Sequence, residues 1–98
     1  MGHFVLTYTL APDYLERRPL WRDAHLTLAK AAVARGELLL GGALSDPADR
    51  ALLLFQGNTA DAAEAFACAD PYVANGLVTD WSVRAWTTVV GPGAAFPM

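Results

Sequence analysis

A histidine and an aspartate that lie far apart in this chain, His25 and Asp70, have the residue types of an acid–base pair. His25 falls in a stretch with helical periodicity, on the side of that helix occupied by Trp21, Leu28 and Ala32. Its imidazole is therefore expected to face the apolar interior, where it needs a hydrogen-bond partner. Asp70 is the best candidate for that partner. An aspartate bonded to one ring nitrogen fixes the tautomer and leaves the other nitrogen free to move a proton.

Such a pair suits the abstraction of a proton next to a carbonyl group, followed by the loss of a leaving group. Two other interpretations of the same residues stay open. In the first, His25 is a structural histidine whose bond to Asp70 ties the helix to a later loop. In the second, His25 is a nucleophile that accepts a phosphoryl or acyl group, with Asp70 beside it and Arg22 binding the anion.

Four further residues are candidates for contact with a small-molecule ligand. Arg22 lies one helical turn before His25, and its guanidinium is able to hold an anionic group through two hydrogen bonds. Tyr72 and Tyr8 each have a hydroxyl group to donate into a pocket, and Ser45 follows two glycines near the expected pocket mouth. Each also has a structural interpretation: an exposed or paired arginine, tyrosines that pack in the core, and a plain turn at the serine.

The composition fits a single domain with an oligomer interface. The chain has 98 residues, of which 54% are hydrophobic and 17% are charged. It is more apolar than a typical small domain, so part of its apolar surface is expected to lie between subunits. The net charge of −3, with one tight basic pair at Arg17 and Arg18, argues against a nucleic-acid partner.

Cysteine and histidine usage argues against metal and disulfide chemistry. Cys68 is the single cysteine, and its alanine-rich surroundings predict a small buried side chain. No intramolecular disulfide is possible, no metal-ligand spacing is recognisable, and no cofactor is expected. The chain has no apolar run as long as a membrane span and no signal-peptide pattern, so we expect no membrane partner and a cytoplasmic location.

The sequence predicts two helices. The first is expected over residues 18–35, because Pro19 suits a first helical turn and Gly36 suits the left-handed position after a helix end. The second is expected to begin at an N-cap formed by Thr59 or Asn58. It should end before the proline at position 71, since the residue before a proline disfavours helical angles.

Apolar patterns predict four strands, over residues 3–10, 38–44, 51–55 and 77–90. The order β-α-β-β-α-β is that of an α+β, ferredoxin-like fold, with an antiparallel sheet and both helices on one face. The other face would expose apolar side chains to water, and two subunits that pack sheet to sheet would bury them. We therefore expect a homodimeric α/β barrel, with a domain over residues 1–90 and a tail over residues 91–98.

Three segments together resemble the YciI-like (YCII-related) family: residues 22–26 (RDAHL), 41–44 (GGAL) and 70–77 (DPYVANGL). The resemblance implies a dimeric α/β barrel fold and an active site with a His and an Asp, which match His25 and Asp70. One branch of the family resembles dehydrochlorinases of chlorinated hydroxyquinols, which implies a lyase for a small cyclic compound. The chain departs from the family where Ala43 replaces a proline and where the turn after it is short, and both changes affect the pocket rim.

The residues and the resemblance together predict a small acid–base enzyme, a lyase or isomerase, with His25 as base and Asp70 orienting it. Its expected ligand is a small cyclic or anionic organic compound. The alternative is a non-catalytic dimer that binds a metabolite in the same pocket or serves another protein. Turnover that is lost with His25 while the fold survives would favour the enzyme, and affinity without turnover would favour the binding module.

Overall fold

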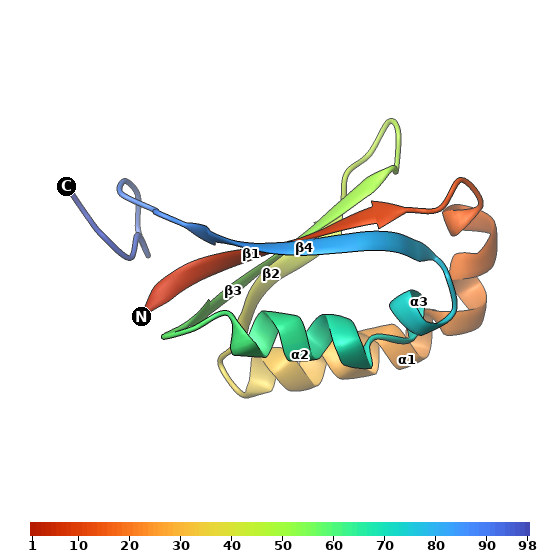
Figure 1. The fold of residues 1–98 in the computed structure, drawn as a ribbon, viewed down its shortest axis with the longest axis horizontal. Coiled ribbons are helices and arrows are strands. Elements are labelled where there is room, and N and C mark those ends of the chain that lie inside the picture. Colours follow the sequence, from red (N-terminus) through yellow and green to blue (C-terminus); the bar gives the residue numbers. More distant parts are fainter.

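The computed structural model describes residues 1–98 as one antiparallel sheet with three helices against one of its faces (Figure 1). The elements in chain order are β1 (Gly2–Leu10), α1 (Tyr14–Ala34), β2 (Leu38–Ala43), β3 (Arg50–Gly57), α2 (Asp61–Ala69), α3 (Pro71–Ala74) and β4 (Val78–Trp86). The strands lie in the order β2-β3-β1-β4, and all neighbouring pairs are antiparallel. This arrangement confirms the predicted α+β, ferredoxin-like fold. None of the three helices is both long and apolar enough to cross a membrane.

The long helix α1 begins earlier than predicted. Its first residue is Tyr14 rather than Arg18, so Pro19 lies inside the helix and not in its first turn. The buried ring of Tyr14 explains the difference, because its packing in the core outweighs the one backbone hydrogen bond that Pro19 cannot donate. The predicted end is confirmed: Arg35 is the C-cap, and Gly36 follows with a φ of +78°.

The second predicted helix is α2, and its end before Pro71 is confirmed; the short helix α3 that follows was not predicted. The N-cap of α2 is Ala60, so the expectation of Thr59 or Asn58 is wrong. Thr59 still accepts a backbone hydrogen bond from the first helical residue (3.3 Å), although it lies one position before the cap. Asp70 ends α2 and begins α3, because the residue before Pro71 is held in an extended conformation, which breaks the helix there.

Cys68 is exposed, so the prediction of a buried side chain is wrong. The core face of α2 is formed by Ala63, Phe66 and Ala67. Cys68 follows them by one position, which rotates its side chain by about 100° around the helix axis and toward solvent. The alanine-rich composition did not distinguish the two sides of this helix.

The last strand is shorter than predicted. β4 ends at Trp86 and does not reach Val90. Residues 87–98 contain no helix or strand and turn back on themselves, with a hydrogen bond from Phe96 N to Thr88 O (2.9 Å). In Figure 1 this segment extends beyond the end of the sheet at which β1 begins.

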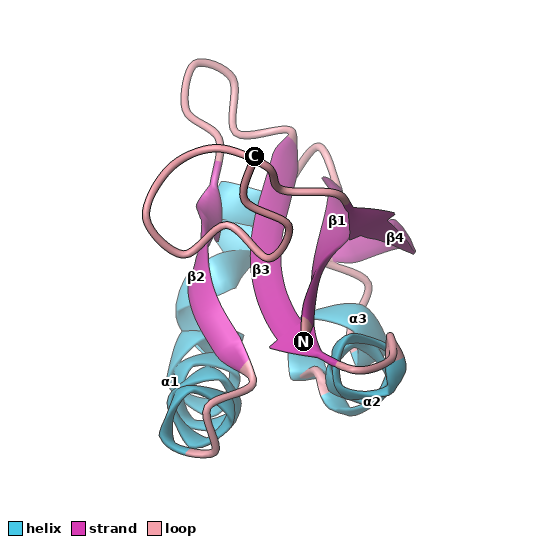
Figure 2. Ribbon diagram, turned by 90° about the vertical axis from the view of Figure 1, so that its left-hand side faces the viewer, coloured by secondary structure: helices cyan, strands magenta, loops and turns pink.

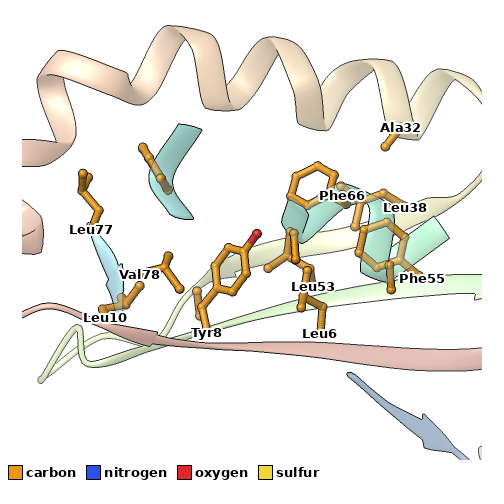
Figure 3. Close-up of a cluster of buried hydrophobic side chains, with 14 of the residues drawn as sticks. Leu6, Tyr8, Leu10, Ala32, Leu38, Leu53, Phe55, Phe66, Leu77 and Val78 are labelled. Atoms are coloured by element: carbon orange, nitrogen blue, oxygen red, sulfur yellow. The ribbon is translucent and has the colours of Figure 1, made fainter. Parts of the chain in front are cut away.

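The core lies between the sheet and the helices. Leu6, Tyr8 and Leu10 of β1 point toward the helices, as the alternating pattern predicted, and pack with Leu53 and Phe55 of β3 (Figure 3). α1 lies beneath β2, at the edge of the sheet, whereas α2 and α3 lie beneath β1 and β4 (Figure 2). The space between α1 and β2 is therefore close to solvent, and the other helices close the sheet on its opposite side.

The other face of the sheet is uncovered and apolar at its centre. Leu40, Leu54 and Val5 are neighbours across β2, β3 and β1, and Arg84 of β4 completes their row. Leu52 lies beside this row, and Leu40 is 72% exposed. This is the face that the sequence assigns to a second subunit.

We expect Leu53→Ala to lower the free energy of unfolding by about 2–5 kcal/mol, because it removes buried methyl groups and leaves a cavity next to Leu6. Urea denaturation measures the loss. Leu15→Ala is the matched control, since Leu15 is exposed on α1, and its effect should stay within about 0.5 kcal/mol. Equal losses in the two variants would contradict the described core.

Candidate active site

The carboxylate of Asp70 is completely buried and is positioned first by its own local sequence. Asp70 is the N-cap of α3 and Pro71 is the first helical residue, so the chain leaves Asp70 in an extended conformation (φ −72°, ψ 121°). The side chain then turns back to accept a hydrogen bond from the backbone N–H of Tyr72 (3.0 Å). The Asp-Pro-Tyr segment thus holds the carboxylate in place before any distant residue contributes.

Two distant residues complete the partners of this carboxylate. The Tyr8 hydroxyl, from β1, donates to Oδ2 at 2.7 Å. Nδ1 of His25, from α1, lies 2.9 Å from Oδ1 and 3.0 Å from Oδ2. Since an ionised carboxylate only accepts hydrogen bonds, Nδ1 carries a hydrogen here. Three donors from three elements therefore meet on one buried group.

This bond directs the second nitrogen of His25 toward open space. The imidazole stacks on the Tyr72 ring (centroids 3.9 Å apart, planes at 5°), and the Phe66 ring lies nearly perpendicular to it, with the two centroids 6.1 Å apart. His25 keeps 16% of its side chain exposed and lines a cavity of about 400 Å³, and no protein group bonds Nε2. In the neutral imidazole this bond makes Nε2 the nitrogen without a hydrogen, held in a fixed orientation at a cavity wall.

The cavity lies between α1 and the edge strand β2, and most of its lining is apolar. Three cations, Arg18, Arg22 and Lys30, line it along α1, and no acidic side chain does. Tyr8 and Tyr72 also line it, although the Tyr8 hydroxyl is engaged by Asp70.

Ser45 does not line this cavity. It lies in the exposed connection between β2 and β3, the loop at the top of Figure 1, and has no side-chain hydrogen bond. Within one chain the structure therefore brings together His25, Asp70, Arg22 and the two tyrosines, and leaves Ser45 outside.

The buried surroundings hold both tyrosines in the protonated form. Burial, and then the charge of Asp70 and the hydrogen bond to it, raise the pKa of Tyr8 well above its usual value. Burial and the neighbouring Tyr14 raise the pKa of Tyr72 to about 12, although the positive charges of Arg22 and Arg18 act in the opposite direction. A protonated Tyr8 is what the Asp70 carboxylate requires, since a phenolate could not donate to it.

Two residues of the site, Tyr14 and Arg18, are not among the candidates that the sequence predicts. Arg18 precedes His25 by two helical turns and so shares its face, a relation that helical spacing alone shows. It was regarded only as half of a basic pair. Tyr14 was placed outside the helix because the helix start was predicted too late. The Tyr14 ring meets the Tyr72 ring edge-on at 5.8 Å.

A family model described as the YCII-related domain matches residues 1–87. The chain belongs to the YCII-related family. No curated protein matches the chain. This match confirms the resemblance that the segments containing His25 and Asp70 indicated for this YCII-related protein.

Solved structures share the fold. The 5-chloro-2-hydroxyhydroquinone dehydrochlorinase TftG of Burkholderia phenoliruptrix AC1100, in complex with 2,5-dihydroxybenzoquinone, superposes with a TM-score of 0.72 at 20% identity, over 88% of this chain and 94% of that chain. An antibiotic biosynthesis monooxygenase-like protein of Deinococcus radiodurans has a TM-score of 0.55 at 17% identity, over 95% and 97% of the chains. A NIPSNAP family protein of Agrobacterium tumefaciens C58 has a TM-score of 0.58 at 12% identity, over 89% and 91%. At these identities the likeness is one of fold.

The raised pKa values of Tyr8 and Tyr72 predict that the free energy of unfolding falls at alkaline pH. An unfolded chain releases tyrosine protons above about pH 10, whereas the folded protein keeps them, so stability is full below that pH. It should fall as the pH rises toward about 12, the value for Tyr72, by about 1.4 kcal/mol per pH unit for each tyrosine. Urea denaturation across this range measures the slope. Tyr8→Phe should be less stable at neutral pH and have a shallower slope; an unchanged slope would contradict the assignment.

Proposed function

We propose that this YCII-related protein is a small acid–base enzyme, a lyase or isomerase, in which Nε2 of His25 removes a proton from a cyclic organic substrate. The observation that carries the proposal is the pairing of Nδ1 with the buried carboxylate of Asp70, which leaves Nε2 unbonded at the cavity wall. A histidine with a purely structural role has no need of a free nitrogen facing a cavity. General-base catalysis by an oriented imidazole contributes about 10²–10⁴ in rate.

In a lyase step the substrate C–H proton passes to Nε2, and its electron pair forms a carbon–carbon double bond. The leaving group departs with its own bonding pair, so charge and atoms balance. The imidazolium that forms is stabilised by Asp70, whose carboxylate keeps the donors Tyr8 and the Tyr72 amide throughout. An isomerase would return the same proton to a different substrate atom.

The structural neighbour TftG supports a lyase and a ring-shaped substrate. It is a dehydrochlorinase, and its structure holds a small quinone. The cavity of this chain, at about 400 Å³ with a mostly apolar lining, is of a size for a single-ring compound.

The first test is turnover of a panel of chlorinated hydroquinones and cyclic ketones in D₂O, followed as halide release and as C–H exchange. His25→Gln should lose at least about 100-fold in kcat, and Asp70→Asn at least about 10-fold, because the imidazole loses its orientation. Arg35→Gln is the control, since its guanidinium lies away from the cavity and pairs with Glu37. Thermal unfolding of each variant separates lost chemistry from a lost fold.

Two further measurements, ligand binding and mass spectrometry, decide between the alternatives. Ring compounds that bind the wild type and are neither exchanged nor converted would replace the enzyme by a binding module. A covalent His25 adduct after exposure to a phosphoryl or acyl donor, seen by mass spectrometry, would replace the base by a nucleophile. Full turnover in His25→Gln would remove His25 from the chemistry.

We also propose that the protein is a homodimer that joins two sheets through their open faces. The support is the apolar row of Leu40, Leu54 and Val5 on a face that no helix covers, with Leu52 beside it. An exposed apolar surface of this kind is typical of an interface between subunits.

Sedimentation at micromolar concentration tests the dimer. The wild type should sediment as a dimer, and Leu52→Asp should sediment as a folded monomer, because a charge at this position would be buried without a partner. Leu15→Asp places the same charge on the solvent side of α1 and should leave the dimer intact. A wild type that is monomeric would overturn the assembly.

A further inference from the structure

The cavity holds two arginines that have no acidic partner. Arg18 and Arg22 lie one turn apart on α1, and both line the cavity beside His25. Other arginines at the two ends of this helix do find partners, since Arg17 pairs with Asp13 and Arg35 with Glu37. The arginine pair, Arg18 and Arg22, is the exception.

The sequence of α1 leaves no intrahelical partner for the arginine pair. An ion pair along a helix needs an acid three or four positions away. The residues at those positions around Arg18 and Arg22 are Tyr14, Leu15, Pro19, Trp21, His25 and Leu26, besides the two arginines themselves. The arginines are also four positions apart, where like charges repel each other. Two unneutralised charges are thus held together on one side of the cavity.

Aromatic contacts hold Arg18 in this place. Its guanidinium carbon lies 5.8 Å from the centroid of the Tyr14 ring, a cation–π contact. Tyr14 in turn touches the edge of Tyr72, and Tyr72 stacks on His25. Arg22 lines the same cavity as Tyr72, Arg18 and His25. The arginine pair and the imidazole are therefore parts of one contiguous cluster.

The wall opposite the arginine pair suits a flat apolar group. β2 lines the cavity with Leu38, Leu39 and Gly41, and a side chain at Gly41 would come within 3.3 Å of Leu53. The absence of a side chain there keeps the space open. A ligand in the cavity thus meets cations on one side and apolar surface on the other.

We propose that the arginine pair binds a carboxylate group of the substrate, which is therefore a ring carboxylic acid. The planar guanidinium fork matches a carboxylate with two parallel hydrogen bonds, and two such groups around one anion fix its orientation. The apolar wall receives the ring and sets a ring C–H toward Nε2 of His25. This inference deepens the proposed acid–base function and relies on it only for the proton transfer, not for binding.

Calorimetric titration with salicylate and with salicylamide, which has the same shape without the charge, tests the arginine pair. The wild type should bind salicylate at least about 10-fold more tightly than salicylamide. Arg18→Gln and Arg22→Gln should each weaken salicylate binding by about 10-fold or more and change salicylamide binding by less than about 2-fold. Arg35→Gln removes one positive charge from the same helix outside the cavity and should leave both affinities unchanged. Arg22→Lys keeps the charge, loses the fork and should retain only part of the affinity.

Several outcomes would overturn the carboxylate site. These are equal affinity for salicylate and salicylamide, equal losses in Arg35→Gln and Arg22→Gln, full affinity in Arg22→Lys, or tighter binding of phenyl phosphate than of salicylate. His25→Asn separates this inference from the proposed function, because it should keep the preference for salicylate over salicylamide while losing any proton transfer. Selective binding without turnover in the wild type would leave the carboxylate site standing and remove the enzyme. Turnover without a preference for carboxylates would do the reverse.

Discussion

A carboxylate that is completely shut off from water is the constraint on which this structure depends. Burial of an unpaired charge is costly, so Asp70 needs donors on every side. The fold supplies them from three elements: the Tyr8 hydroxyl from β1, the His25 ring from α1 and the Tyr72 amide from α3. Each of these bonds also connects two parts of the fold. The need of Asp70 for donors therefore ties α1 and α3 to the sheet, and it sets the tautomer of the neutral His25 ring.

Helix α1 serves packing and chemistry with two adjacent stripes. One stripe, with Leu28 and the buried Ala32, packs in the core. The neighbouring stripe, with Arg18 and Arg22, lines the cavity, and His25 lies at the boundary between the two. Because the same helix carries both, its packing on the sheet fixes the distance between the cations, the imidazole and the wall formed by β2. Substitutions in the packing stripe should consequently change the shape of the cavity, while substitutions on the solvent side of α1 should not.

The success of the sequence predictions followed from how local each feature is. The order of strands and helices and the end of α1 before Gly36 depended on periodicity and local residue types, whereas the pairing of His25 with Asp70 across 45 residues depended on residue types that few other positions share and on the family resemblance. The start of α1 was wrong because Pro19 is a strong local signal and the burial of Tyr14, which overrides it, is tertiary. Cys68 and the cap of α2 were wrong because a short alanine-rich helix has little amphipathic contrast to define its sides and ends.

The sequence by itself determined the alternation of the strands, the extended conformation of Asp70 before Pro71, and which residues of α1 share one side of that helix. These features follow from backbone sterics and side-chain spacing. Only the tertiary structure decided what each polar group does. The Tyr8 hydroxyl bonds Asp70 instead of reaching into the cavity, Ser45 lies outside the cavity, and Arg18 joins the site through Tyr14. The reason is that a hydrogen bond or an aromatic contact between residues far apart in the chain depends on the angles at which whole elements pack. Those angles are set by the core as a unit and by no single segment.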